Sequence, residues 1–148
     1  MLRIPFMAKT MMAVLLAGTY VIGSKPNRPI AEARWRAILE PLAGGKVRGG
    51  VTVEAKGTES TRFTITIRDA PPNASLAWHM HSGTCANPGG PVGSGYPELH
   101  VGPGGTAESA VTLAVAPPGT GDYLVQVHGP TGAPISCGIL KSIVTGTP

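Results

Sequence analysis

Residues 62–68, with the sequence RFTITIR, alternate strictly between polar and apolar side chains. Successive side chains of a β-strand point to opposite faces of a sheet, so this alternation predicts a strand with one apolar face. The same period recurs at Val51 and Val53, at Val111, Leu113 and Val115, and at Tyr123, Val125 and Val127. Clusters of Gly and Pro separate these segments, which predicts short strands joined by turns.

Seven strands are predicted on this basis, at residues 35–42, 47–55, 61–68, 76–81, 106–116, 123–128 and 137–144. The 21 Gly and 15 Pro among 148 residues disfavour long helices, and the length suits one domain. We therefore expect an all-β fold, an antiparallel sandwich or barrel of about seven to eight strands. Residues 83–105, which are rich in Gly and Pro, are expected to form the one long loop.

Residues 1–33 have the pattern of an export signal. A short cationic start precedes an apolar run at residues 11–23, and residues 31–33 (AEA) supply a small-x-small cleavage pattern. Cleavage near residues 21–23 and retention as a membrane anchor are the alternatives, although the apolar run is shorter than the roughly 20 residues of a membrane-spanning helix. We expect a signal peptide and a secreted or periplasmic location.

Removal of this leader changes the charge balance of the chain. The whole chain has a formal net charge of +4, and residues 1–33 contribute four basic residues and one acidic residue to it. Residues 34–148, the expected domain, are therefore almost neutral and have no basic stripe to bind phosphate groups. Nucleic acid is not expected as a partner, and membrane contact is expected only through an uncleaved leader.

Cys85 and Cys137 lie 52 positions apart, one in the long loop and one at the start of the last predicted strand. In an exported protein an isolated pair is most simply a disulfide, because oxidising compartments favour that bond. Two thiolate metal ligands are the less favoured alternative, since the pair lacks the close spacing of a thiolate site.

Three histidines fall on the side of predicted strands that faces away from the core. His79 and His81 are two residues apart, so they point the same way, whereas Trp78 and Met80 point to the core. His128 ends the strand at residues 123–128, again on the non-core side. Two imidazoles from one strand and one from another suit copper or zinc and leave an open coordination position. Solvent-facing or hydrogen-bonded histidines without a metal are the alternative.

Five short motifs and a Pro-rich turn occur in one order along the chain. They are Gly-x-Val within residues 48–53, Pro71-Pro72, the His-x-His pair at residues 79–81, Cys85, hydrophobic-x-hydrophobic-His at residues 125–128, and Cys-Gly-aliphatic at residues 137–139. In this order they resemble the copper/zinc superoxide dismutase family, over roughly residues 35–143.

The resemblance implies a Greek-key β-barrel with a Cys85–Cys137 bridge and a copper ion held by His79, His81 and His128. In the family the copper alternates between Cu(II) and Cu(I), oxidising one superoxide to oxygen and reducing the next to hydrogen peroxide. His100 is a candidate fourth ligand in one alignment. In the alignment that we prefer, His100 is a strand residue.

Two features of the family are missing from this chain. The loop after Cys85 is short and does not supply a complete set of zinc ligands, so a separate zinc site is not expected. The arginine that guides the anion to copper in the family corresponds to Pro134, three residues before Cys137. A guanidinium near the metal raises the local concentration of the anion and orients it, so its absence implies slower turnover.

The sequence therefore predicts an exported, copper-binding, superoxide dismutase-like protein with weakened dismutation, whose partners are superoxide or the copper ion. Two other functions stay open. One is non-catalytic copper binding for storage or delivery, and the other is an envelope interaction role for a metal-free β-sandwich.

Overall fold

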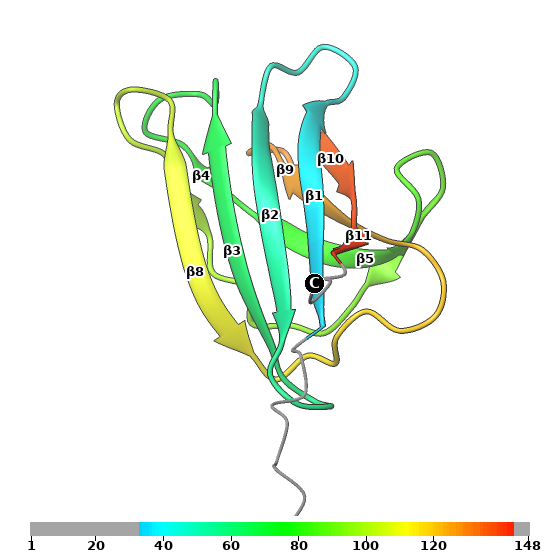
Figure 1. The fold of residues 1–148 in the computed structure, drawn as a ribbon. Helices are drawn as coiled ribbons and strands as arrows, with labels where there is room; N and C mark the ends of the chain where they lie inside the picture. Colours follow the sequence, from blue (N-terminus) through cyan, green and yellow to red (C-terminus); the bar gives the residue numbers. More distant parts are fainter. Residues whose placement is uncertain (1–32, 144–148) are drawn as a thin grey trace, which may run out of the picture.

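The computed structural model describes residues 33–143, and this part of the chain forms eleven β-strands and no helix (Figure 1). The strands are β1 (Arg34–Pro41), β2 (Arg48–Ala55), β3 (Thr61–Arg68), β4 (Ser75–Leu76), β5 (Trp78–Gly83), β6 (Pro88–Pro91), β7 (Leu99–His100), β8 (Ala107–Leu113), β9 (Tyr123–His128), β10 (Pro134–Ile139) and β11 (Lys141–Ile143). The predicted leader, except Ala33, lies outside the described residues. Within them, no helix has the length and hydrophobicity needed to cross a membrane.

Nine strands form one curled antiparallel sheet, in the order β6-β5-β9-β10-β1-β2-β3-β8, with β11 also paired to β1. In Figure 1 the sheet has a front half, made of β1, β2, β3, β8 and β11, and a rear half, made of β5, β6, β9 and β10. The two halves join at β1, which pairs with β10 at Glu40 and Pro41 and with β11 at its beginning. Long connections from β3 to β5 and from β8 to β9 carry the chain between the halves. This confirms the expected all-β fold.

The core fills the space between the two halves, as the period-two pattern predicts. Phe63, Ile65 and Ile67 are buried on the inner face of β3, and Trp78 and Met80 are fully buried on the inner face of β5. The rings of Phe63 and Trp78 meet edge to face, with centroids 5.7 Å apart. The faces of β5 and β3 that point away from the core are therefore free to carry polar side chains.

Two of the predicted strands are interrupted. The segment at residues 76–81 breaks at Ala77, whose carbonyl accepts a hydrogen bond of 2.8 Å from the amide of His128. The last predicted strand starts earlier than expected, at Pro134, and breaks at Leu140, whose amide donates to the carbonyl of Tyr123 over 2.9 Å. At Ala77 and at Leu140, a backbone hydrogen bond to a residue of β9 takes the place of the regular strand pairing.

Residues 83–105 were expected to form one loop, but the segment contains β6 and β7. The amide of Val92 donates to the carbonyl of Met80 over 2.8 Å, so the chain folds back along β5 immediately after the turn at residues 84–87. β7 pairs with β4 as a separate two-stranded sheet. Pairing of β6 with β5 makes β6 the edge strand of the rear half.

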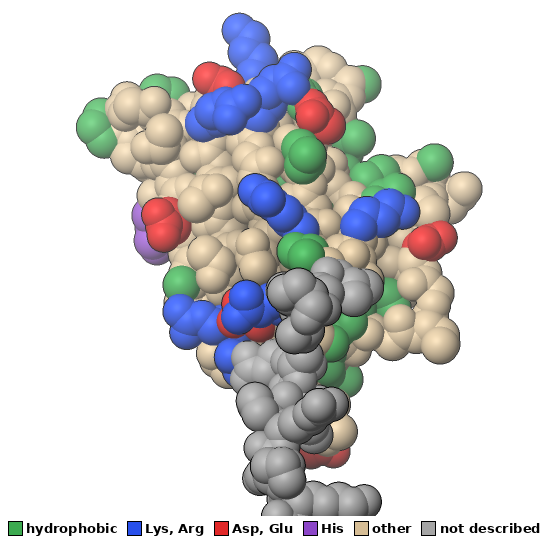
Figure 2. Space-filling view, in the orientation of Figure 1, with side chains coloured by type: hydrophobic (Ala, Val, Ile, Leu, Met, Phe, Trp, Pro, Cys, Tyr) green, Lys and Arg blue, Asp and Glu red, His purple; other side chains and the backbone are tan. Residues whose placement is uncertain are grey.

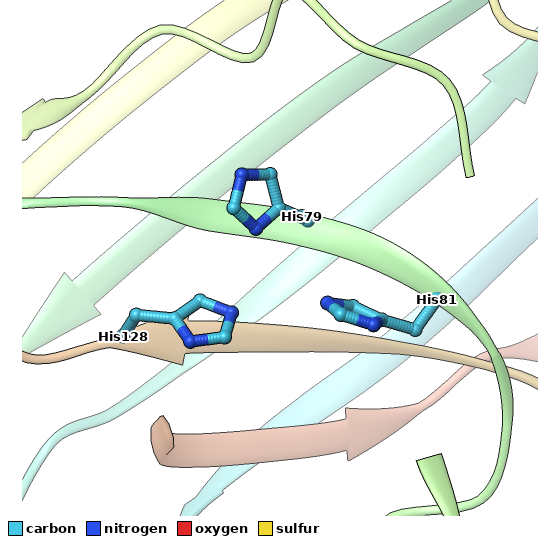
Figure 3. A group of neighbouring side chains, drawn as sticks. All are labelled: His79, His81 and His128. Carbon is cyan, nitrogen blue, oxygen red and sulfur yellow. The ribbon is translucent and has the colours of Figure 1, made fainter. Parts of the chain in front are cut away.

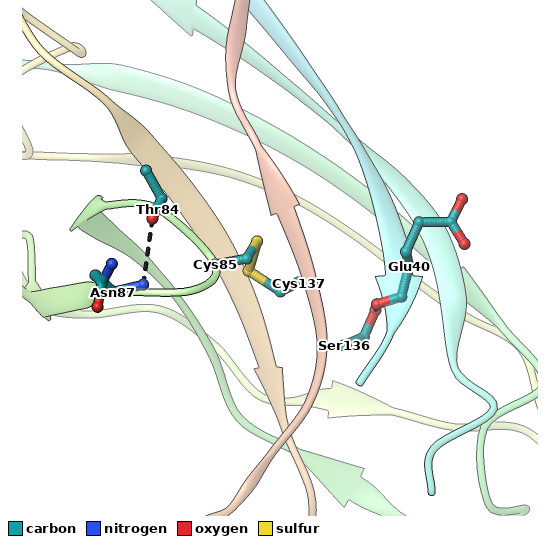
Figure 4. The surroundings of a disulfide bond; sticks show 6 residues. All are labelled: Glu40, Thr84, Cys85, Asn87, Ser136 and Cys137. Atoms are coloured by element: carbon teal, nitrogen blue, oxygen red, sulfur yellow. Dashed lines mark hydrogen bonds between the residues drawn. A yellow bond between two sulfur atoms is a disulfide. The ribbon is translucent and has the colours of Figure 1, made fainter. Parts of the chain in front are cut away.

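Cys85 and Cys137 form the predicted disulfide, with their Cα atoms 6.0 Å apart (Figure 4). Cys85 lies in a tight turn in which the amide of Asn87 contacts both the carbonyl and the hydroxyl of Thr84, at 3.1 and 3.2 Å. Next to Cys137 on β10, the hydroxyl of Ser136 donates to the carbonyl of Glu40 over 3.0 Å. The bridge therefore ties the turn before β6 to β10, the strand of the rear half that pairs with β1.

Candidate metal centre

β5 and β9 place three histidines on the outer face of the rear half. The two strands are antiparallel neighbours, and their register pairs Trp78 with Val127 and His79 with Gln126. Inward-facing Trp78 and Val127 are fully buried, so the alternate residues His79 and His81 point outward, and His128 follows Val127 on the same side. Figure 3 shows the three imidazoles turned toward one another from these two strands.

The three imidazoles are close enough to bind one metal ion. Each offers a ring nitrogen, and these three atoms all lie within 4.8 Å of one another. The centroid of the His79 ring lies 5.9 Å from that of the His81 ring and 5.2 Å from that of the His128 ring. The centroids of the His81 and His128 rings are 5.9 Å apart. In the part of the chain that is described, no other group of three potential metal ligands is found.

Backbone carbonyls orient two of the rings. Nδ1 of His81 lies 2.9 Å from the carbonyl oxygen of Gly89, and Nδ1 of His128 lies 3.0 Å from that of Gly132. Because a carbonyl oxygen only accepts, each Nδ1 is the donor, and Nε2 of each neutral ring carries the free lone pair. Hydrogen bonds of this kind fix the tautomer and the direction of a metal-binding imidazole.

The Nε2 atoms of His81 and His128 are buried and have no hydrogen-bond partner. A buried polar nitrogen without a partner is unfavourable by about 1–3 kcal/mol, so such atoms are rare in folded proteins. A metal ion bound between the rings would satisfy both. The donor set fits copper or zinc, since imidazole suits each and both cysteines are held in the disulfide.

His79 is the third member of the group, and its pKa is lowered. Burial lowers its pKa below 6.5, and the positive charge that His128 and His81 would carry when protonated lowers the pKa further. Only a neutral imidazole binds a metal, so His79 keeps its lone pair at a lower pH than an isolated histidine does. Its ring meets that of Tyr96 edge to face, with centroids 5.5 Å apart.

Tyr96 and the two carbonyls were not found by sequence reasoning. Tyr96 lies in the long Gly-rich segment, and its hydroxyl donates to the carbonyl of Val92 over 2.7 Å. Burial raises the pKa of Tyr96 to about 12. Gly132 has φ +85°, a conformation that glycine adopts without strain, so a glycine in the turn after His128 is the one sequence signal of its role.

His100, the candidate fourth ligand, is not brought to this group. It lies on β7, is exposed, and its Nδ1 is 3.0 Å from the hydroxyl of Ser75 on β4. The structure thus gives His100 the position of a strand residue. His79, His81 and His128 come together, and His100 lies elsewhere.

The surroundings of the histidines carry almost no charge. β5, β6, β9 and β10 contain no Lys, Arg, Asp or Glu. Pro134, the position that corresponds to the guiding arginine, is exposed at the start of β10 and pairs with His128. The histidines therefore lie on strands that carry no charged side chain.

The sequence matches no protein-family model and no curated protein.

Proposed function

We propose that the protein is an exported copper-binding protein of the superoxide dismutase type, which dismutes superoxide slowly to oxygen and hydrogen peroxide. One observation carries the proposal: His81 and His128 hold two buried, unpartnered Nε2 atoms close to a ring nitrogen of His79. The Cys85–Cys137 disulfide supports export, since such bonds persist in oxidising compartments.

Copper is favoured over zinc by the ligand set. All three donors are imidazole nitrogens, and with a given set of nitrogen donors Cu(II) binds more tightly than Zn(II). When bound, copper supplies a one-electron redox couple that zinc lacks. Three protein ligands leave a coordination position for a small molecule.

The chain itself contributes ligand orientation and access. The carbonyls of Gly89 and Gly132 hold two rings in place, so the donor atoms need little rearrangement on binding. His79 and His128 are only partly buried, which leaves an approach for a small anion from their side. The strands of the rear half offer no acidic side chain as a proton donor, so we expect the protons for peroxide formation to come from solvent.

Copper storage or delivery is the second candidate, and the lack of cationic side chains on the strands of the site favours it. A cationic side chain near the metal attracts superoxide, whereas binding a copper ion does not require one. The position of the guiding arginine is taken by Pro134, and no Lys or Arg lies on the four strands of the rear half.

A measurement of superoxide decay tests the first candidate. The full chain is loaded with one equivalent of Cu(II), and superoxide generated by pulse radiolysis is followed directly. We expect catalytic decay that is absent from His128→Ala and retained by the control His100→Ala. We also expect the rate to change little with ionic strength. Salt screens the attraction between charges, and no Lys or Arg lies on the four strands of the rear half to attract superoxide. Stoichiometric copper without catalytic decay would replace the first candidate by the second.

A further inference from the structure

All eight Lys and Arg residues of the described chain lie on the front half of the sheet or in the turns beside it. They are Arg34, Arg36, Lys46, Arg48, Lys56, Arg62, Arg68 and Lys141. Figure 2 shows this side of the molecule, with the cationic side chains spread over β1, β2, β3 and β11. These cations are far apart along the sequence, which is why no basic stripe was expected. Folding brings them together on one side of the molecule.

The acidic side chains on this half do not neutralise its cations. Five carboxylates lie there, at Glu40, Glu54, Glu59, Asp69 and Glu108, so the half carries a net charge of about +3. Glu54 is shared between Arg34 at 3.2 Å and Lys56 at 3.5 Å.

Four cations have no carboxylate partner among the described residues. They are Lys46, in the turn before β2, and three residues on strands, Arg36, Arg62 and Lys141. Arg36 and Lys141 lie directly opposite each other on β1 and β11, so their side chains point to the same outer face. We call this outer side of β11, β1, β2 and β3 the basic face.

The basic face also holds both large hydrophobic side chains that are exposed in the described chain. Ile38 is 68% exposed and lies opposite Gly50, and Ile143 is 39% exposed and lies opposite Arg34. Gly50 has no side chain, and a shallow hollow of about 390 Å³ opens over it with Arg36 and Arg68 at its rim. The basic face thus combines exposed apolar side chains with cations.

We propose that the basic face binds an anionic phospholipid surface. Arg36, Arg62 and Lys141 would contact headgroup phosphates, and Ile38 would enter the boundary between headgroups and acyl chains. The histidines lie on the outer face of the other half of the sheet, so a molecule bound in this way directs its candidate metal centre away from the membrane. The proposal does not depend on copper binding.

The same features disfavour two other partners. The outward residues of β1, β2 and β3 include no aromatic side chain, so the face lacks the stacking platform of proteins that bind single-stranded nucleic acid. A nucleic acid would also leave Ile38 exposed. A second copy of the chain would bring two cationic faces together, which repel each other.

Binding to vesicles tests the proposal with the full chain, which keeps the leader identical in every sample. Sedimentation measures partitioning onto phosphatidylcholine vesicles with and without phosphatidylglycerol. The variant Arg36→Gln/Arg62→Gln/Lys141→Gln removes three charges, and the matched control Arg36→Lys/Arg62→Lys/Lys141→Arg keeps them. Ile38→Ser removes the apolar contact. Near-ultraviolet circular dichroism checks the folding of each variant.

We expect phosphatidylglycerol to increase binding of the wild type and the charge-keeping control, and added salt to weaken it. Each cation near an anionic membrane contributes roughly a fivefold change in partitioning, so the three Gln substitutions should lower it on the order of 100-fold. Ile38→Ser should lower it further. Single Gln variants replace the triple one if that variant misfolds, with a smaller loss expected from each.

Three results would overturn the proposal. Equal binding of the wild type and the Gln variants would mean that the leader alone contacts the vesicles. A second contrary result is that Ile38→Ser binds vesicles as well as the wild type does and that double-stranded DNA displaces both proteins equally from the vesicles. This result would assign the basic face to a soluble polyanion. Charge-dependent self-association without vesicle binding would assign it to another copy of the chain.

Discussion

His81 and His128 adopt the same arrangement from two different strands: each directs Nδ1 to a backbone carbonyl and leaves Nε2 buried without a partner. A ring nitrogen of each lies within 4.8 Å of that of the other and of His79. The two carbonyls set the ring orientation before any ion arrives. The rings of His81 and His128 are therefore oriented without a metal, and a metal ion bound between them would give their unpartnered nitrogens a partner.

Metal binding should raise the thermal stability of the protein. A metal that binds only the folded state stabilises it by about 4 kcal/mol at a concentration a thousandfold above Kd, or roughly 10–20 °C in Tm for a domain of this size. Differential scanning calorimetry with Cu(II) or Zn(II) measures the change. The rise should vanish in His128→Ala and persist in His100→Ala. An equal rise in His128→Ala would place the stabilising metal elsewhere.

Gly132→Ala should weaken copper binding through His128. Gly132 has φ +85°, and no atom lies within 4 Å of a Cβ added there, so the substitution strains the backbone without a clash. Movement of its carbonyl removes the acceptor of Nδ1, and loss of such a contact typically lowers metal affinity by about 10–100-fold. Gly44→Ala is the matched control, because Gly44 has φ +78°, equal free space and no contact with the histidines.

Competitive titration of each variant with a copper chelator gives these affinities. The destabilisation from backbone strain should be similar in the two variants, about 1–2 kcal/mol. Equal copper affinities for Gly132→Ala and Gly44→Ala would show that the Gly132 carbonyl does not orient His128.

The metal-free protein should lose stability in acid because of His79. Its pKa is lowered below 6.5 in the folded state, chiefly by burial and then by His128 and His81. As the pH falls below 6.5, the unfolded chain binds a proton that folded His79 does not, so the free energy of unfolding decreases. Urea unfolding between about pH 7 and about pH 5 measures the slope, which should be shallower in His79→Gln. The same slope in both proteins would contradict the lowered pKa.

The Cys85–Cys137 disulfide should stabilise both the fold and the metal centre. It closes a loop with a sequence separation of 52, which corresponds to about 4 kcal/mol in the chain-entropy treatment. It also anchors the turn before β6, the strand whose Gly89 carbonyl holds His81. The double variant Cys85→Ser/Cys137→Ser should unfold at a much lower urea concentration. Its copper affinity, measured below that concentration, should fall as well, and an unchanged affinity would separate the bridge from the metal centre.

The period-two pattern and the parity of residues within a strand predicted much of the fold and of the candidate site. Alternation alone buries Phe63 and Ile65, and it also places His79 and His81 on the outer face of β5. These features depend on local geometry, which a strand fixes within a few residues.

Features that depend on long-range pairing were not predictable in the same way. The carbonyls of Gly89 and Gly132 belong to the backbone, so no side-chain pattern marks their contacts with His81 and His128. The basic face arises because β11 returns beside β1, which brings Lys141 opposite Arg36 across more than a hundred positions of sequence. Register and strand order, which determine such meetings, are absent from a local pattern.

Copper analysis of the purified protein tests the central claim most directly. The full chain, its His128→Ala variant and the control His100→Ala are incubated with excess Cu(II), freed of loosely bound ion by dialysis, and measured for copper per chain. We predict about one copper ion per chain for the wild type and for His100→Ala, and almost none for His128→Ala, since the site requires three imidazoles. Equal copper contents in the wild type and His128→Ala, or no retained copper in the wild type, would contradict the assignment of His79, His81 and His128 as a metal centre.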